Sequence, residues 1–176
     1  KLLGEAVVSR TNNNFSMRAI DLNRDRSMAL VVATTEETSN RPYSFIYSFK
    51  GNKFSTVAER ISYFVSVMRV PPTYAPTLVG QAWDSLKLFA PGVRIMTKQD
   101  GKFTLGARID LPTGATVFNC VWLLAGKNGK GEQLVMLTED ERIKLFQGHG
   151  NTLVHTTMDR YSGSATGMDH YKGMPG

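Results

Sequence analysis

The sequence predicts an α+β fold in which two four-stranded antiparallel β-sheets are each followed by a helix. Stretches that alternate apolar and polar residues are typical of half-buried strands, and after each series of strands the apolar spacing becomes helical. One segment also occurs twice, because residues 56–64 and 138–146 have Thr, Glu, Arg, Ile and Phe at matching positions. In both copies Thr-x-x-Glu matches a capping box, in which the two side chains bond amide groups at a helix N-terminus. We therefore interpret the chain as a duplicated ββββα unit.

The first half of the chain is expected to contain four strands and one helix. The strands are expected at residues 6–8, 15–20, 28–35 and 43–49. The last strand alternates four aromatic residues with smaller ones, namely Tyr43, Phe45, Tyr47 and Phe49. Their alternation predicts one aromatic face, buried in the core beneath a helix. After a turn at Gly51-Asn52, the helix is expected to begin at Thr56 and to end before Pro71.

The second half is expected to repeat this order after a connector that contains a short helix at residues 78–89. Its strands are expected at residues 93–98, 103–110, 116–125 and 133–137, with a helix from Thr138. Asp100-Gly101 is a strong signal for a type I′ hairpin turn between the first two of these strands. The glycine-rich segment at residues 126–131 predicts another hairpin turn.

These elements predict a single domain at residues 1–160, built of repeats at about 1–72 and 91–160 with a connector at 73–90. Residues 161–176 have little periodicity and are expected to form a tail. No stretch reaches the ~20 apolar residues of a membrane-spanning helix, and no targeting segment is recognised. We therefore expect a soluble protein with no membrane partner.

The chain carries 21 Lys and Arg against 15 Asp and Glu, a formal net charge of +6 that favours a polyanionic partner. Strand alternation predicts that Arg94, Lys98, Lys102 and Arg108 share one sheet face. With cations of other strands and turns, they make up the expected nucleic-acid contacts: Arg18, Lys50, Lys53, Arg94, Lys98, Lys102, Arg108, Lys127 and Lys130. Such side chains bind phosphates and release counterions, with little preference for base sequence.

No catalytic residue, metal ligand or cofactor is expected. Cys120 is the only cysteine, so no internal disulfide is possible, and the three histidines do not have the spacing of zinc ligands. None of His149, His155 and His170 has a carboxylate or nucleophile at a spacing that indicates general base catalysis. We therefore expect a non-enzymatic protein without a small-molecule substrate. A hydrolase that uses one of the histidines is the least favoured alternative.

Two passages of the sequence resemble the Whirly family of single-stranded nucleic-acid binders. The first, residues 43–64, has aromatic residues, then Lys53-Phe54-Ser55 and Glu59, and the second is residues 132–139. Residues 3–7 read Leu-Gly-Glu-Ala-Val, where plant members of the family carry lysines. With this change, the chain looks most like the kinetoplastid mitochondrial RNA-binding proteins, also called guide-RNA-binding proteins.

The resemblance implies a mitochondrial RNA-binding protein that acts in RNA editing, in a heterotetramer with a related sister subunit. It also implies that guide RNA is held through its phosphates, so that annealing of guide RNA with mRNA is promoted. Two alternatives stay open. One is a single-stranded DNA-binding protein of the Whirly type, and the other is a viral matrix or assembly protein that binds membranes or polyanions through the same charge.

Overall fold

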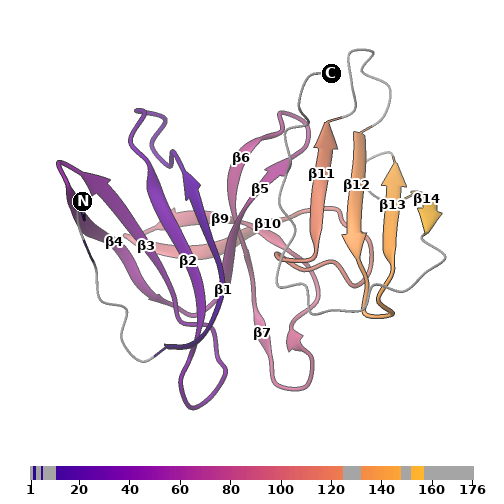
Figure 1. Ribbon diagram of the computed structural model, residues 1–176, viewed down its shortest axis with the longest axis horizontal. Helices are drawn as coiled ribbons and strands as arrows, with labels where there is room; N and C mark the ends of the chain where they lie inside the picture. Colours follow the sequence, from indigo (N-terminus) through magenta and orange to yellow (C-terminus); the bar gives the residue numbers. More distant parts are fainter. Residues whose placement is uncertain (1, 3–4, 6–10, 125–131, 148–151, 157–176) are drawn as a thin grey trace.

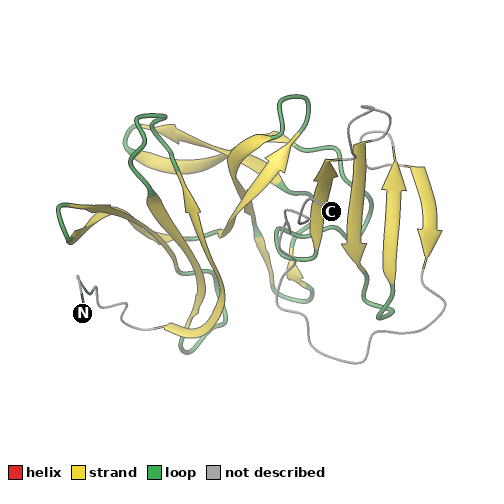
Figure 2. Ribbon diagram, turned by 45° about the horizontal axis from the view of Figure 1, so that its top comes forward, coloured by secondary structure: helices red, strands yellow, loops and turns green. Residues whose placement is uncertain are grey.

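A computed structural model describes residues 2, 5, 11–124, 132–147 and 152–156. Every regular element among them is a β-strand, and Figure 2 shows strands joined by loops, without a helix in this part of the chain. The predicted α+β class is therefore wrong, and the described chain is all-β. No helix able to cross a membrane is found among these residues. Three predicted features lie outside them: the strand at 6–8, the turn at 126–131 and the tail at 161–176.

The described residues form three four-stranded antiparallel sheets and one small hairpin. The first sheet is a meander of β1 Thr11–Ile20, β2 Ala29–Glu36, β3 Ser44–Lys50 and β4 Lys53–Ile61. The second sheet, in the order β10-β9-β6-β5, consists of β5 Phe64–Val70, β6 Ala75–Gln81, β9 Arg94–Gln99 and β10 Lys102–Arg108. Between β6 and β9 lies the hairpin of β7 Trp83–Asp84 and β8 Leu88–Phe89. The third sheet is a meander of β11 Cys120–Leu124, β12 Glu132–Leu137, β13 Ile143–Gln147 and β14 Thr152–Thr156.

The second sheet lies between the other two. Figure 1 shows the first and third sheets at opposite ends of the molecule, with β5 and β6 between them. β5 contacts β1 and β2 of the first sheet and β11 of the third, while the edge strand β4 contacts the edge strand β10. One apolar core runs through all three sheets and includes Val31, Phe64 and Trp122, which are almost completely buried.

The first predicted helix, from Thr56 to residue 70, is instead the end of β4 and the whole of β5. Both faces of β5 are covered, because neighbouring residues such as Phe64 and Val65 are both completely buried. A strand covered on both faces has a nearly continuous apolar sequence, which spacing alone does not distinguish from a buried helix. The short helix predicted at residues 78–89 is wrong for the same reason, since β6 also buries neighbouring residues there.

The second predicted helix, from Thr138, is instead the turn between β12 and β13, followed by β13 itself. The backbone N–H and the hydroxyl of Thr138 both donate to the carbonyl of Arg142, each at 2.9 Å. Glu141 N–H donates to the Thr138 carbonyl at 2.9 Å, with Glu141 at a φ of 60°. Thr138 therefore closes a hairpin, whereas Thr56 lies within β4 opposite Tyr47, so the two similar segments have different structures.

The turns predicted at Gly51-Asn52 and Asp100-Gly101 are confirmed, whereas a turn expected at Asn12-Asn13-Asn14 is wrong because these residues lie within β1. Gly51 and Asn52 have φ values of 58° and 62°, and Asp100 and Gly101 have φ values of 49° and 77°. Positive φ at both central positions is the signature of a type I′ turn, which matches the twist of the flanking strands. These turns join β3 to β4 and β9 to β10. Three of these strands, β3, β9 and β10, begin within two residues of the starts predicted for them, and β4 was not predicted as a strand.

The aromatic residues of β3 lie on the face of the first sheet that points away from the main core. Phe45 is opposite Val32, and these two residues form a second apolar cluster with Tyr47. Phe45 and Tyr47 are 4% and 7% exposed, which confirms their predicted burial. The helix expected to cover them is absent from the described residues, and it is the intervening Ile46 that packs in the main core.

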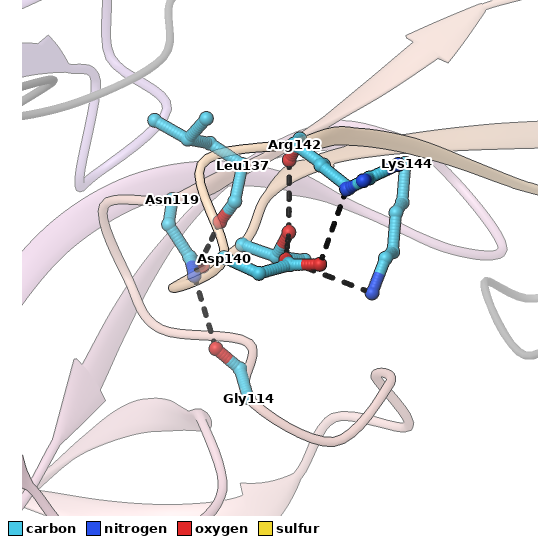
Figure 3. Close-up of polar contacts among 7 residues, drawn as sticks. Gly114, Asn119, Leu137, Asp140, Arg142 and Lys144 are labelled. Atoms are coloured by element: carbon cyan, nitrogen blue, oxygen red, sulfur yellow. Dashed lines mark hydrogen bonds and ion pairs between the residues drawn. The ribbon is translucent and has the colours of Figure 1, made fainter. Parts of the chain in front are cut away.

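The side-chain amides of Gln81, which is buried, and Asn119, which is half-buried, fix the long segment between the second and third sheets. Gln81, which is 1% exposed, donates from Nε2 to the Ala90 carbonyl at 2.7 Å and accepts from Val117 N–H at 3.1 Å. Asn119 donates from Nδ2 to the carbonyls of Gly114 and Leu137, both at 3.0 Å (Figure 3). These bonds satisfy backbone groups that have no strand partner, so the segment is held in one position.

Candidate nucleic-acid interface

A groove of about 570 Å³ lies where two turns meet at one end of the first sheet. In a four-stranded meander, the β1–β2 connection and the β3–β4 turn come out at the same end, so the topology brings them together. Residues 25–28 form one side of the groove, and residues 49–52 form the other. We call this feature the hairpin-end groove.

Aspartate side chains shape the β1–β2 side of the hairpin-end groove. The Asp21 carboxylate accepts hydrogen bonds from the N–H groups of Asp25 and Arg26, at 3.1 and 2.9 Å. Asp25 accepts from both the N–H and the hydroxyl of Ser27. These bonds hold Arg26 at a φ of 69°, in the left-handed region that L-residues other than glycine rarely adopt. The loop therefore keeps a strained backbone that places one cation at the groove.

Asp25 is ionised in this loop at neutral pH. Hydrogen bonds from the side chain and then the backbone of Ser27 lower the pKa of the Asp25 carboxyl, and the charge of Lys50 lowers it further. The groove thus contains one carboxylate, already engaged by Ser27, beside the cationic side chains of Arg26 and Lys50. Its polar lining has a positive balance.

Two apolar side chains give the groove a hydrophobic part. Phe49 is opposite Phe54 across β3 and β4, with ring centroids 4.9 Å apart, and it is 37% exposed. Met28 is 47% exposed, and its carbonyl accepts from Phe49 N–H at 3.4 Å. An exposed aromatic ring beside cations is the combination on which single-stranded nucleic acids bind, since every base has a face that stacks.

The predicted cations include two pairs in which like charges are directly opposite each other. Lys50 is opposite Lys53 at the β3–β4 turn, and Arg94 is opposite Arg108 across β9 and β10. Like charges in this position destabilise a sheet. No ion pair connects any of these side chains to a carboxylate in the part of the chain that the structure describes. Lys53 lies on β4 and Arg108 on β10, and these two edge strands contact each other.

The prediction that four cations of β9 and β10 share one face is wrong for Lys102. Lys98 is opposite Phe103, with its ammonium 5.8 Å from the ring centroid, whereas Lys102 is opposite Gln99 and therefore on the other face. A bulge between Leu105 and Arg108 inserts one extra residue into β10. The bulge brings Arg108 to the face of Arg94 and Lys98.

Arg18 is not on the outer face of its strand. It is opposite Val31 of β2, which is 1% exposed, so Arg18 lies on the inward side of β1 and is itself half-buried. Lys127 and Lys130 lie outside the described residues. The structure therefore brings Lys50 to the hairpin-end groove, with Lys53 directly opposite it across the turn. It leaves Arg94, Lys98 and Arg108 exposed on the second sheet, and it places Arg18 on the inward side of β1.

Arg26, Met28 and Phe49 were not predicted as binding residues. Arg26 belongs to a polar connection, residues 23–26, in which the sequence shows a turn but not its conformation. Phe49 was assigned to the core with the other aromatics of β3. Its position as the last aromatic before Gly51-Asn52 is the signal for its exposure, because it lies next to the turn at the end of the hairpin.

The described residues do not form a metal site or activate the cysteine. No group of three His, Cys, Asp or Glu side chains able to hold a metal ion is found among them. Burial raises the pKa of the Cys120 thiol to about 12, and its Sγ donates to the Thr116 carbonyl at 3.3 Å. Cys120 is therefore a protonated thiol at neutral pH and not a nucleophile.

Comparison of the chain with models of protein families, with curated proteins and with solved structures gave no match.

Proposed function

We propose that this protein binds single-stranded RNA without catalysing a reaction, with one base in the hairpin-end groove and the backbone on the neighbouring cations. The observation that carries the proposal is the position of Phe49, an exposed ring that shares one groove with Lys50 and Arg26. Stacking of one base on an aromatic ring contributes about 1–3 kcal/mol by alanine substitution. The ring therefore supplies an interaction that does not depend on base identity.

The cation pairs supply the second part of the binding energy. Lys50 and Lys53 repel each other in the free protein, and a phosphate between them turns this repulsion into two attractions. Each phosphate neutralised on a single strand releases counterions, with a salt slope of about 0.7 per contact. The exposed Arg94, Lys98 and Arg108 extend the same chemistry onto the second sheet. RNA affinity is therefore expected to fall steeply as salt is added.

Promotion of annealing follows from the same contacts. Two complementary RNA strands repel each other through their phosphates, and cations that neutralise one strand lower this barrier. Annealing of guide RNA with mRNA in mitochondrial RNA editing, and assembly with a sister subunit, depend on the resemblance to the guide-RNA-binding proteins. They stay predictions.

Fluorescence anisotropy with a labelled oligouridylate of about 20 nucleotides, titrated at several concentrations between roughly 50 and 200 mM salt, tests the proposal. The double substitution Lys50→Gln and Lys53→Gln is expected to weaken binding and to flatten the salt slope by about 1. Lys87→Gln, which removes one exposed lysine of the β7–β8 turn, is the matched control and leaves the slope unchanged. Equal slopes for the double variant and the control would contradict the proposal.

Two further samples separate the alternatives. Oligothymidylate of the same length shows whether DNA binds as well as RNA, and vesicles with anionic lipid test for a membrane-binding assembly protein. Binding to the vesicles together with no affinity for either oligonucleotide would replace the proposed function by the assembly function.

A further inference from the structure

A second concave site, separate from the hairpin-end groove, lies where the three sheets meet. It is a cleft of about 200 Å³ between β1, the start of β6, the whole middle of β5 and the segment that leads into β11. Arg18 of β1 and Arg69 of β5 both line it, together with Ser66. Since sheets of different parts of the chain form its walls, we name it the junction cleft.

Two guanidinium groups give the junction cleft its charge. The register places Arg18 on the inward side of β1, and Arg69 is half-buried near the end of β5. Arg69 donates from Nη1 to the Tyr74 carbonyl at 3.1 Å, which fixes the plane of the group. A guanidinium has five N–H donors, so this single bond leaves a fork of donors available for an anion.

The rest of the lining is apolar. Met68, Phe118 and Val121 are among the residues that line it, and no Asp or Glu is among the described residues that do so. Cys120 also lines it, as a protonated thiol whose Sγ donates to a backbone carbonyl. A cleft with two cations, no acid and apolar walls matches a ligand with a negative head and a hydrophobic body.

The size of the cleft limits the body of that ligand. An apolar cavity of about 150 Å³ holds a benzene molecule, so the junction cleft, at about 200 Å³, has room for one ring and a carboxylate. We propose that the junction cleft binds a small monocarboxylate with an aromatic or short aliphatic body. The carboxylate pairs with the guanidinium of Arg69, and the body packs against the wall at Met68 and Phe118. Arg18, whose Nη1 donates to the Met17 carbonyl at 3.1 Å, lines the same cleft.

Titration of the isotope-labelled protein with benzoate, followed by amide NMR, tests this site directly. Saturable shifts are expected in β5 and β11, with a dissociation constant on the order of 1 mM, as befits so small a ligand. Benzyl alcohol has a similar shape without the charge and is expected to bind at least about tenfold more weakly, since a charge-assisted bidentate contact is lost. Equal binding of the two compounds would overturn the carboxylate assignment.

Variants locate the site. Arg69→Met is expected to weaken benzoate binding about tenfold, whereas Arg60→Met, which removes an exposed arginine of β4, leaves it unchanged. Val121→Phe fills the cleft and keeps both arginines. If this variant no longer binds benzoate while its unfolding midpoint is unchanged, the result supports binding of benzoate in the junction cleft. Benzoate shifts that persist in both Arg69→Met and Val121→Phe would contradict the proposal. The lysine substitutions at the hairpin-end groove leave benzoate binding intact, so this proposal and RNA binding fail independently.

Discussion

Lys50 and Lys53 are directly opposite each other across the two-residue turn that joins β3 and β4. Antiparallel strands place directly opposite side chains on the same face, so the two ammonium groups share one side of the hairpin. Natural sheets commonly put opposite charges or apolar residues in such positions, because like charges cost stability. An anion bound between the two ammonium groups offsets their repulsion, so the pair is consistent with the proposed binding of RNA phosphates.

Reversal of one charge in this pair should separate stability from binding. Lys53→Glu changes a repulsion into an attraction and is expected to raise the free energy of unfolding by about 0.5 kcal/mol. The same variant is expected to bind RNA more weakly, because a phosphate now meets a carboxylate. Urea unfolding and anisotropy measure the two effects, and a variant that loses both stability and affinity would contradict this explanation of the pair.

Phe49→Ala is expected to weaken RNA binding about tenfold while the salt slope stays constant, because base stacking releases no counterions. Phe49→Trp retains a stacking surface and is expected to bind at least as tightly as the parent chain. Thermal unfolding of both variants controls for loss of the ring contact with Phe54. A reduced slope in Phe49→Ala would show that the ring acts by positioning the lysines and not by stacking.

Asp25 is expected to make stability depend on pH. Its pKa is lowered below the ordinary value of 3.8, so the charged form is favoured in the folded state. The stabilisation is complete above the pKa of the unfolded chain and is lost as the pH falls through the lower folded pKa. Asp25→Asn should therefore lower the free energy of unfolding at neutral pH, with a difference from the parent chain that shrinks below about pH 4. Urea unfolding at neutral and at acid pH measures the difference in free energy of unfolding between Asp25→Asn and the parent chain. An equal difference at the two pH values would contradict a lowered pKa of Asp25 in the folded state.

Gln81→Leu tests how the second sheet holds the segment before β11. The substitution removes the partners of the Ala90 carbonyl and the Val117 N–H, and burial of unpaired backbone groups costs about 1–3 kcal/mol each. We expect unfolding to become easier by about 2 kcal/mol or more, measured by urea denaturation. No change in Gln81→Leu would mean that the amide bonds do not stabilise the fold.

Strands and tight turns were predictable where one local rule decides the structure. The alternation at residues 43–49 gave β3, and Gly51-Asn52 and Asp100-Gly101 gave type I′ turns because few residue types tolerate positive φ. The helices were not predictable in the same way. β5 is buried on both faces, so Phe64, Val65 and Met68 fit a helical stripe and a covered strand equally well.

The duplicated segment shows why a short motif does not determine its structure. Thr-x-x-Glu satisfies amides at a helix start, but at Thr138 the same hydroxyl bonds Asp140 and the Arg142 carbonyl and closes a hairpin. Asp140 then pairs with Arg142, just before β13, and with Lys144 of β13, at 3.7 and 3.8 Å (Figure 3). Tertiary pairing of β13 with β12 decides between the two outcomes, and the local sequence does not contain it.

The candidate site was predictable only in part. Exposed cations follow from charge and alternation, which identified Lys50 and Lys53, but their position opposite each other depends on register. The bulge in β10 moved Arg108 to the face of Arg94. Gly106, which lies in the shifted stretch, is a residue type that often marks a bulge, but it does not give the new register. Arg26 enters the groove because hydrogen bonds to Asp21 shape its loop, and these bonds are a property of the folded chain.

The most direct test of the account is an amide NMR titration of the labelled protein with a short oligouridylate. Binding in the hairpin-end groove predicts saturable shifts concentrated at residues 25–28 and 49–53, with smaller shifts along β9 and β10. Saturable binding that leaves residues 49–53 unmoved, or no binding at low salt, would contradict the proposed interface.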